Sequence, residues 1–464
     1  MRKIEDIYFD NFDEALKIAE EQNVFGPYNN LQICYYDGPI RKKNLKNLIH
    51  LPLNNFSETL IHLGTRIPTK IIHDNKNLVE FELNNFLEKK EKIHLDLKNK
   101  ILKKHLNFNE KLRIYISAEY GGKVVLRTYK FLSKLFNENG FDVYFDINDE
   151  LTLMDDYRRS KSIEEFNPHL TFNINRLRNE QIHPDTFNFI WFMDPTLILF
   201  DDSSLNLRKR DYIFYIGNEI YSALKNKKIP EEKIIHQFLT PDYNIFKFSG
   251  NIKKENKVIF VGQNYFEVIE PTKSYKNHPV VNDLTNLFNN NEITFEKLNE
   301  LKEKYSSTIK RDEHIEVFIY PAVVRQEIVK WICQQDKIKV EIYGEGWNNI
   351  VETKTFSKGV IKSEEKLNEI YNSAKYSLVV HSSFMYIPKL FESSAANCIP
   401  LVYRGITTLD DFKHNKNVLT FSDKKSLYNS LDKKTEESPI EISKQISTKS
   451  ILDKILSIIQ KEFK

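Results

Sequence analysis

One short stretch, residues 371–404, constrains the fold of this chain more than any other. It contains two apolar, strand-like runs, Tyr376–His381 and Ile399–Tyr403, and between them Pro388 opens a short helix. Two buried strands joined through a helix predict a parallel βαβ unit, and such units bind ligands in the crevice beyond the carboxyl ends of their strands. Glu392 falls on that helix, shortly after the strand-to-helix loop, so we expect its carboxylate to reach into the crevice.

The same alternation of strand and helix begins twice further upstream. From Lys111 the chain reads as a strand (LRIYISAEY), a Gly121-Gly122 turn, an amphipathic helix over 124–139 and a second strand (FDVYFDI). From Lys257 the run KVIFVG starts the pattern again. Repeated strand–helix–strand patterns predict the α/β class, with two successive doubly wound parallel domains.

These patterns divide the chain into a short accessory region, two domains and a final helix. Strand-like pieces at Gln32–Tyr36 and Leu78–Leu83, followed by a Lys-rich helical pattern, predict a small α+β region at the start. Residues 441–464 have the pattern of one closing amphipathic helix. The expected divisions are 1–109, 110–250, 251–440 and 441–464.

Composition and charge exclude several classes of protein. The 464 residues are 41% hydrophobic and 29% charged, which is ordinary for a globular protein. A net charge of +3 is too small to indicate a nucleic-acid-binding protein. Basic runs at Arg41–Lys46 and Arg208–Arg210 predict a solvated surface, and contact with anionic lipid or a phosphorylated acceptor is the alternative.

The ends of the chain and its cysteines bear on location. Acidic residues occupy the N-terminal positions where a signal peptide would need an apolar core. Cys34, Cys333 and Cys398 are few, distant and odd in number, so the sequence predicts neither a disulfide framework nor a metal cluster. We expect a cytoplasmic protein, with peripheral contact at the inner face of the membrane as the alternative.

From Lys111 onward the sequence resembles GT-B glycosyltransferases, more narrowly the family 1/4 enzymes and the spore-maturation glycosyltransferase-like type. The resemblance is carried by KVIFVG, VEIYGEGW, GVIKSEEKLNEIYNSAKYSLVVHSS and IPKLFESSAANCIPLVYRG. It implies two Rossmann-like domains facing a cleft, with the acceptor side first and the nucleotide-sugar side second. The implied activity is transfer of a sugar from a nucleotide-diphosphate donor to a glycan, lipid-linked glycan or protein, in cell-envelope polysaccharide biosynthesis. The donor would be a co-substrate, and no cofactor is expected.

Sugar transfer needs a hold on the diphosphate, whose negative charge grows as the sugar leaves. Glycine turns, helix N-termini and cations supply such a hold. We expect this role for Gly262, Arg325, Ser382, Ser383 and Lys389. The alternatives are a solvated helix residue for Lys389 and, as the favoured interpretation, an exposed position for Arg325. Gly344 and Gly346 predict a tight turn, either against a ligand or without one.

The resemblance implies that Glu392 accepts hydrogen bonds from the ribose hydroxyls of the donor; the alternative is an ordinary surface glutamate. This chain also departs from the family pattern. Many related enzymes carry two glutamates eight positions apart, whereas Phe384 stands at the earlier position here. Lys389 replaces the commoner arginine, and Asn397 stands where the small-residue turn usually has glycine. Phe384 cannot supply a carboxylate to the reacting sugar.

The base that activates the acceptor should come from the first domain. Asp194 follows the strand-like run FNFIWFM, and Glu119 precedes Gly121-Gly122. Either carboxylate could accept a proton if burial raised its pKa, although an acid at a strand end is more often a cap or turn former. His381 also ends a strand, where a structural, hydrogen-bonded histidine is the favoured interpretation.

The sequence has no Asp-x-Asp pair, which disfavours a metal-dependent transferase and predicts metal-independent chemistry. Two other functions remain open. A nucleotide-sugar epimerase of the same architecture would act on the donor without an acceptor. A non-catalytic protein that kept the fold would bind nucleotide or glycan without releasing sugar, and Phe384 is the residue that motivates this alternative.

Overall fold

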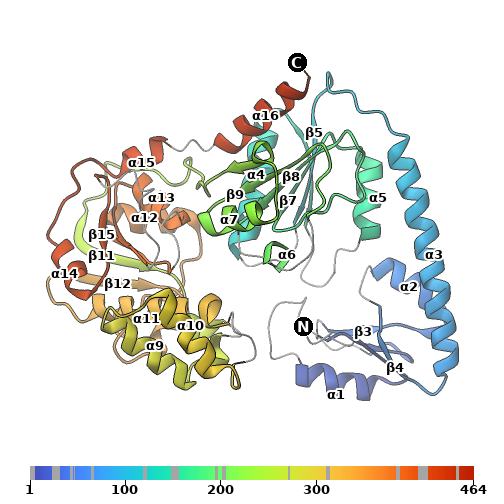
Figure 1. Ribbon diagram of the computed structural model, residues 1–464, viewed down its shortest axis with the longest axis horizontal. Coiled ribbons are helices and arrows are strands. Elements are labelled where there is room, and N and C mark those ends of the chain that lie inside the picture. Colours follow the sequence, from blue (N-terminus) through green and yellow to red (C-terminus); the bar gives the residue numbers. More distant parts are fainter. Residues whose placement is uncertain are drawn as a thin grey trace. The chain divides into compact units, whose positions relative to one another are not determined.

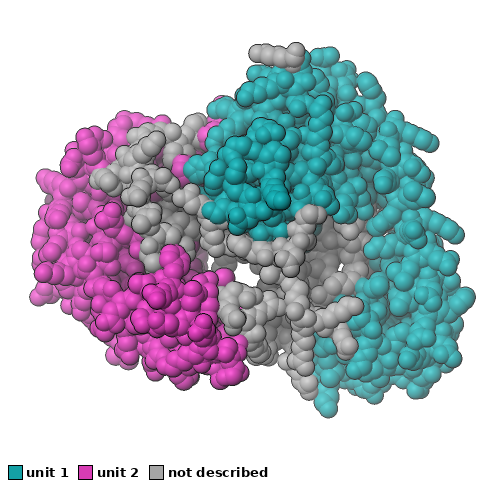
Figure 2. Space-filling model, in the orientation of Figure 1, with its two compact units in different colours: residues 1–237, 451–464 teal, residues 238–450 magenta. Residues whose placement is uncertain are grey.

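The computed structural model separates the chain into two compact units. Residues 1–237 and 451–464 form unit 1, and residues 238–450 form unit 2 (Figures 1 and 2). The sequence placed this division near residue 250. The structure describes residues 6–22, 32–41, 45, 47–63, 67–118, 123–147, 156–193, 197–200, 205–269, 272–309, 314–382, 387–405, 416–445 and 449–463.

The first part of unit 1 has its own small sheet, in the order β3-β2-β1-β4. Every pairing described in it is parallel, so this part has the α/β arrangement, and the predicted α+β class for this region was wrong. The strands are β1 (Ile7–Phe9), β2 (Cys34–Tyr36), β3 (Leu48–His50) and β4 (Lys70–Ile72). The helices are α1 (Phe12–Gln22), η2 (Leu53–Asn55), α2 (Phe56–Leu63) and α3 (Lys76–Leu102).

Helix α3 corrects one prediction from the sequence. Leu78–Leu83 belongs to this 27-residue helix and is not a strand. Its alternating pattern of apolar and acidic residues resembles a half-buried strand, but only Val79 of the six residues is fully buried. These residues continue without a break into the Lys-rich helical segment that follows, so they form the first turns of the same helix.

The second part of unit 1 is a six-stranded parallel sheet in the order β10-β9-β8-β7-β5-β6. Strands β7 and β8 are buried at every position, which is typical of a parallel sheet covered on both faces. The strands are β5 (Arg113–Ala118), β6 (Asp142–Ile147), β7 (Leu170–Ile174), β8 (Phe187–Phe192), β9 (Asp211–Tyr215) and β10 (Ile234–His236). The helices are α4 (Lys123–Glu138), α5 (Asp156–Phe166), α6 (Leu197–Phe200), α7 (Asn218–Asn226), η3 (Glu231–Lys233) and α16 (Ser450–Glu462).

Unit 2 is built on a five-stranded parallel sheet in the order β12-β11-β13-β14-β15. Its strands are β11 (Glu255–Val261), β12 (Lys339–Tyr343), β13 (Ala374–Val379), β14 (Ile399–Tyr403) and β15 (Leu419–Phe421). Its helices are α8 (Tyr265–Val268), η4 (Thr272–Tyr275), α9 (Pro279–Asn289), α10 (Phe295–Tyr305), the π-helical turn η5 (Ile315–Ile319), α11 (Tyr320–Cys333), η6 (Trp347–Asn349), α12 (Glu364–Ser373), α13 (Pro388–Ala395), α14 (Lys424–Ser430) and α15 (Ile440–Gln445).

The C-terminal segment differs from the single helix that the sequence predicted. It forms α15 and α16, and the two helices belong to different units. The α/β class and the parallel doubly wound sheets, in contrast, are confirmed by the strand orders and pairings. Among the described residues, no helix is both long and apolar enough to cross a membrane.

Candidate functional site

The strand order of unit 2 points to one edge of its sheet. The chain passes from β11 outward to β12 and then returns to β13 on the other side of β11. In an open parallel sheet, a crevice for ligands forms beyond the carboxyl ends of the two strands at such a reversal. Gly262 directly follows β11, and His381 and Ser382 follow β13. The topology therefore places three residues that the sequence singled out at this reversal.

Gly262 is held by the loop that follows β12. Its amide donates to the Tyr343 carbonyl at 2.8 Å, and its carbonyl accepts from Trp347 Nε1 at 2.6 Å. A Cβ atom on Gly344 would lie 2.2 Å from the Gly262 carbonyl oxygen, and Gly344 has a φ of +142°. The two loops thus touch backbone to backbone, which only glycine permits at residue 344.

Gly346 completes this turn with a φ of +87°, and a Cβ there would lie 2.6 Å from Glu267 Cβ. The sequence left open whether the Gly344–Gly346 turn approaches a ligand. The structure shows that close packing within unit 2 is enough to require both glycines.

Two cations from different helices converge on Gly262. A Cβ atom at this glycine would meet Arg325 Nη1 at 3.0 Å and Lys389 Nζ at 3.2 Å. Lys389, in the first turn of α13, donates to the Val261 carbonyl. Arg325, on α11, is partly buried rather than exposed. Two positive charges this close repel each other, so the edge is electrostatically suited to an anion.

The Arg325 guanidinium lies over the Tyr265 ring, with its Cζ 3.9 Å from the ring centroid. Burial lowers the pKa of Arg325, against the effect of a hydrogen bond with Tyr265. Within the described parts of the chain Arg325 forms no ion pair with a carboxylate. Its charge is therefore positioned by aromatic contact, and no acid among the described residues neutralises it.

His381 lies at the end of β13, in the same environment. Burial, together with the positive charge of Arg325, lowers the pKa of His381 to about 3. The imidazole is therefore neutral near pH 7, so it offers one nitrogen as a donor and the other as an acceptor. Ser382 beside it is buried as well, with 4% of its surface exposed.

Glu392 is buried within α13, with 4% of its surface exposed, and Tyr371 on α12 donates to its Oε2 at 3.3 Å. This burial excludes the alternative of an ordinary surface glutamate. A buried carboxylate needs hydrogen-bond donors to offset its lost hydration, and Tyr371 supplies one of them. Lys389 and Glu392 occupy adjacent turns of the same short helix, which begins at Pro388.

Four residues that the sequence singled out lie outside the described residues: Glu119, Asp194, Ser383 and Phe384. The strands that precede them are described, and β5 ends at Ala118 while β8 ends at Phe192. The assignment of Asp194 or Glu119 as the base stays a prediction.

Three residues at this edge were missed by sequence reasoning. They are Tyr265 on Arg325, Trp347 on the Gly262 carbonyl and Tyr371 on Glu392. Trp347 directly follows the Gly344-Glu345-Gly346 turn, and this position in the sequence could have indicated that it packs near that turn. Tyr265 and Tyr371 contact their partners across 60 and 21 residues, distances at which sequence periodicity carries no information.

Comparison with known proteins bears on this region. Residues 325–449 match the family model described as "Glycosyl transferase-like". The matched segment contains α11 from Arg325 onward, β13 with His381 after its end, and α13 with Lys389 and Glu392. The resemblance predicted from the sequence is confirmed over this part of the chain. No curated protein matches the sequence.

Several solved structures have a similar chain trace. The Anabaena protein HepE, solved in complex with UDP-glucose, is 10% identical, with 75% of this chain and 100% of HepE covered and a TM-score of 0.45. Sucrose-phosphate synthase from Thermosynechococcus elongatus is 9% identical, with 76% of this chain and 99% of the synthase covered and a TM-score of 0.46. TarM is 14% identical, with 62% covered and a TM-score of 0.34, and this chain spans 54% of TarM.

Proposed function

We propose that this protein is a glycosyltransferase whose unit 2 binds a nucleoside diphosphate sugar at the reversal between β11 and β13. One observation carries the proposal: Arg325 and Lys389 converge beside Gly262 at the carboxyl edge of the sheet. Both cations belong to the segment that matches the glycosyl transferase-like family model. A doubly cationic edge suits the diphosphate, which is the most strongly charged part of such a donor.

The same geometry suits the chemistry of transfer. The diphosphate leaves with more negative charge than it carries in the donor, so nearby cations stabilise the transition state more than the ground state. Arg325 and Lys389 would take this role without a metal ion. Ser382 follows β13 and would add a donor at the same edge, and Ser383, which lies outside the described residues, is expected from the sequence to add another.

Glu392 would accept hydrogen bonds from the ribose hydroxyls, the role that the family resemblance implies. It lies one turn after Lys389 on α13, so a single helix would contact both the phosphates and the nucleoside. Asp194 or Glu119 of unit 1 would accept the proton of the acceptor hydroxyl.

The acceptor class follows the resemblance: a glycan, a lipid-linked glycan or a protein of the cell envelope. A cytoplasmic location, with peripheral membrane contact as the alternative, stays a prediction from the acidic N-terminus and the basic runs.

Binding of nucleoside diphosphate tests the proposal, with UDP and UDP-glucose as first probes. Glu392→Ala and Arg325→Gln should each weaken UDP binding in calorimetry by about 1–3 kcal/mol, because each removes a charged hydrogen-bonding group. The matched control is Glu369→Ala on α12, whose carboxylate is exposed and bonded to Lys366. Unchanged UDP affinity in both site variants would contradict the proposed donor site.

Product analysis then separates the rival functions. Sugar release that requires an added acceptor supports a transferase. Conversion of the donor sugar in the absence of an acceptor would identify an epimerase. UDP binding without turnover on envelope acceptors would favour a non-catalytic binding protein, consistent with Phe384 at the position of the missing glutamate.

A further inference from the structure

The larger sheet of unit 1 has a reversal of its own. Its order β10-β9-β8-β7-β5-β6 places β6 and β7 on opposite sides of β5. A ligand crevice is therefore expected beyond the carboxyl ends of β5 and β7. A small pocket lies at this edge, lined among the described residues by Ser117, Tyr129, Asn173, Ile174, Arg176 and Arg178.

The pocket is small and polar. Its space is about 160 Å³, including the part that is open to solvent. The enclosed part of this space is far smaller than a site for a drug-sized ligand, so the pocket could take only a single compact group at its open side and not a whole sugar nucleotide. Two of its described lining residues are arginines and none is a carboxylate.

The loop after β7 holds both arginines in position. Asn175 and Arg178 have φ values of 58° and 42°, in the left-handed region; asparagine adopts this region readily, whereas arginine rarely does, so the strain lies at Arg178. The conformation is fixed by hydrogen bonds: Asn175 Oδ1 accepts from the Met193 amide at 2.8 Å, and the Leu177 carbonyl accepts from Asn188 Nδ2 at 2.9 Å. Strained backbone of this kind is retained where the surroundings impose it, and it concentrates at functional sites.

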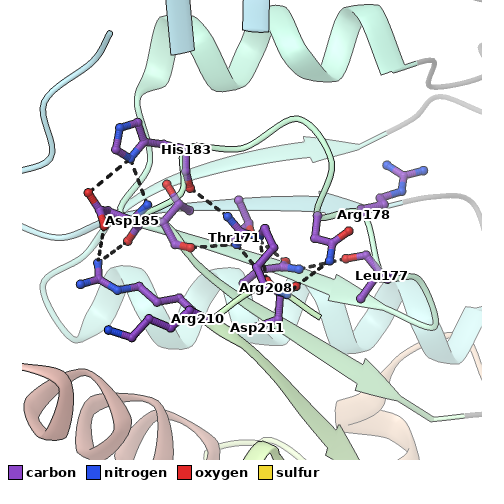
Figure 3. A network of polar contacts seen from close by, with 12 residues as sticks. Thr171, Leu177, Arg178, His183, Asp185, Arg208, Arg210 and Asp211 are labelled. Atoms are coloured by element: carbon purple, nitrogen blue, oxygen red, sulfur yellow. Dashed lines mark hydrogen bonds and ion pairs between the residues drawn. The ribbon is translucent and has the colours of Figure 1, made fainter. Parts of the chain in front are cut away.

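A polar network beside the loop adds to this constraint. Asp211 is fully buried and accepts from Arg208 Nη2 at 2.8 Å and from Asn179 Nδ2 at 2.6 Å. Figure 3 shows this network, with the Arg178 side chain extending away from Arg208 and Asp211. Arg178 instead donates to Ser117 Oγ at 3.0 Å, at the end of β5. Its guanidinium is thus directed to the pocket side of the loop.

Two further groups in the pocket retain hydrogen-bonding capacity. The Tyr129 hydroxyl accepts from the Ile174 amide at 2.7 Å, and it donates to no group in the described residues. Burial raises the pKa of Tyr129, so the hydroxyl keeps its proton. Asn173 is 1% exposed, and its Oδ1 has no partner among the described residues. A buried acceptor without a partner is costly, and a ligand hydroxyl would satisfy it.

We propose that this pocket binds a phosphoryl group of the acceptor, held by Arg176, Arg178 and Tyr129, with a neighbouring hydroxyl of the acceptor donating to Asn173. A phosphoryl group fits better than a carboxylate because it offers more oxygens and more charge to two arginines and a phenol. This inference rests on the proposed function, in which unit 1 takes the acceptor, and it narrows the acceptor to a phosphorylated one.

Calorimetry on the full chain tests the pocket, with inorganic phosphate as the probe and acetate and UDP in separate arms. Arg178→Gln and Arg176→Gln should each weaken phosphate binding about tenfold, the loss expected for one charged hydrogen bond, and leave UDP affinity unchanged. Arg176 is exposed, so its variant is expected to fold even if Arg178→Gln is unstable. Arg41→Gln is the matched control, because that exposed arginine pairs with Asp13 on α1, in the first part of unit 1.

Several results would overturn the inference: no phosphate binding by the natural chain, equal phosphate affinity in the two pocket variants, acetate binding as tight as phosphate, or displacement of phosphate by UDP. Failure of the proposed function looks different. In that case phosphate would bind through Arg176 and Arg178 while UDP would not bind at all. The pocket would then be a phosphate site, but its assignment to a glycosyl acceptor would be lost.

Discussion

The two larger sheets have the same strand order around their reversals, yet the edges beyond those reversals are built differently. In unit 2, a glycine-to-glycine backbone contact fixes the edge, and the cations reach it from helices α11 and α13. In unit 1, a strained loop after β7 carries the arginines directly. Topology thus determines where a site can form, and the local residues determine which ligand it suits.

The two edges also differ in the interactions that fix their backbone. The edge of unit 2 depends on two loops that approach too closely for any Cβ atom, whereas the loop in unit 1 depends on side-chain hydrogen bonds to Asn175, Leu177 and Arg178. Backbone packing of the first kind tolerates almost no substitution. Where side-chain hydrogen bonds hold the loop, side chains that take no part in those bonds can be substituted without changing the loop conformation.

The largest effect is expected from Gly344→Ala. The added Cβ would collide with the Gly262 carbonyl oxygen, and the backbone would be strained at a φ of +142°. We expect the free energy of unfolding of unit 2 to fall by about 3 kcal/mol or more, measured by urea denaturation. Gly359→Ala is the control, because Gly359 also has a positive φ of +77° but no atom lies within 4 Å of its Cβ position. This variant should lose only about 1 kcal/mol. Equal losses would show that the contact between the loops is unimportant.

A smaller effect concerns acid stability and Glu341, a buried carboxylate on β12. Burial alone would raise the pKa of Glu341, but hydrogen bonds from Lys339, Lys257 and Tyr343 lower it to about 2. Because the folded pKa lies below the ordinary value of 4.5, the stabilisation is complete above about pH 4.5 and is lost as the pH falls toward 2.

Glu341→Gln should therefore flatten this part of the stability profile. Between pH 6 and pH 3, urea denaturation should show the natural chain losing about 1 kcal/mol more than the variant, after allowance for the solvent around Lys339. Glu369→Gln, at an exposed position on α12, should leave the profile unchanged. Parallel profiles for the natural chain and Glu341→Gln would rule out this origin of acid sensitivity in unit 2.

Local patterns made most of the fold predictable. Apolar runs such as KVIFVG and FNFIWF form buried parallel strands. They are buried by adjacent strands and helices, which the same alternation of apolar runs and helical patterns also predicts. Patterns with two interpretations were less reliable: Leu78–Leu83 is helical, and the C-terminal segment forms two helices.

The candidate site was only partly predictable, because its contacts are remote in sequence. Arg325 reaches Gly262 across 63 residues, and an exposed position was the favoured interpretation for it. Glu392 was selected from its place after a strand, but its burial against Tyr371 required the fold. The pocket of unit 1 was not predicted at all, since the positive φ value at Arg178 leaves no trace in the residue type.

Hydrogen exchange with and without saturating UDP tests the central claim most directly. If unit 2 binds the diphosphate at its reversal, amides in residues 258–264 and 387–395 should exchange more slowly with UDP, while those in residues 170–178 should not change. Protection confined to residues 170–178, or no protection at either edge, would contradict the assignment of the donor site to unit 2.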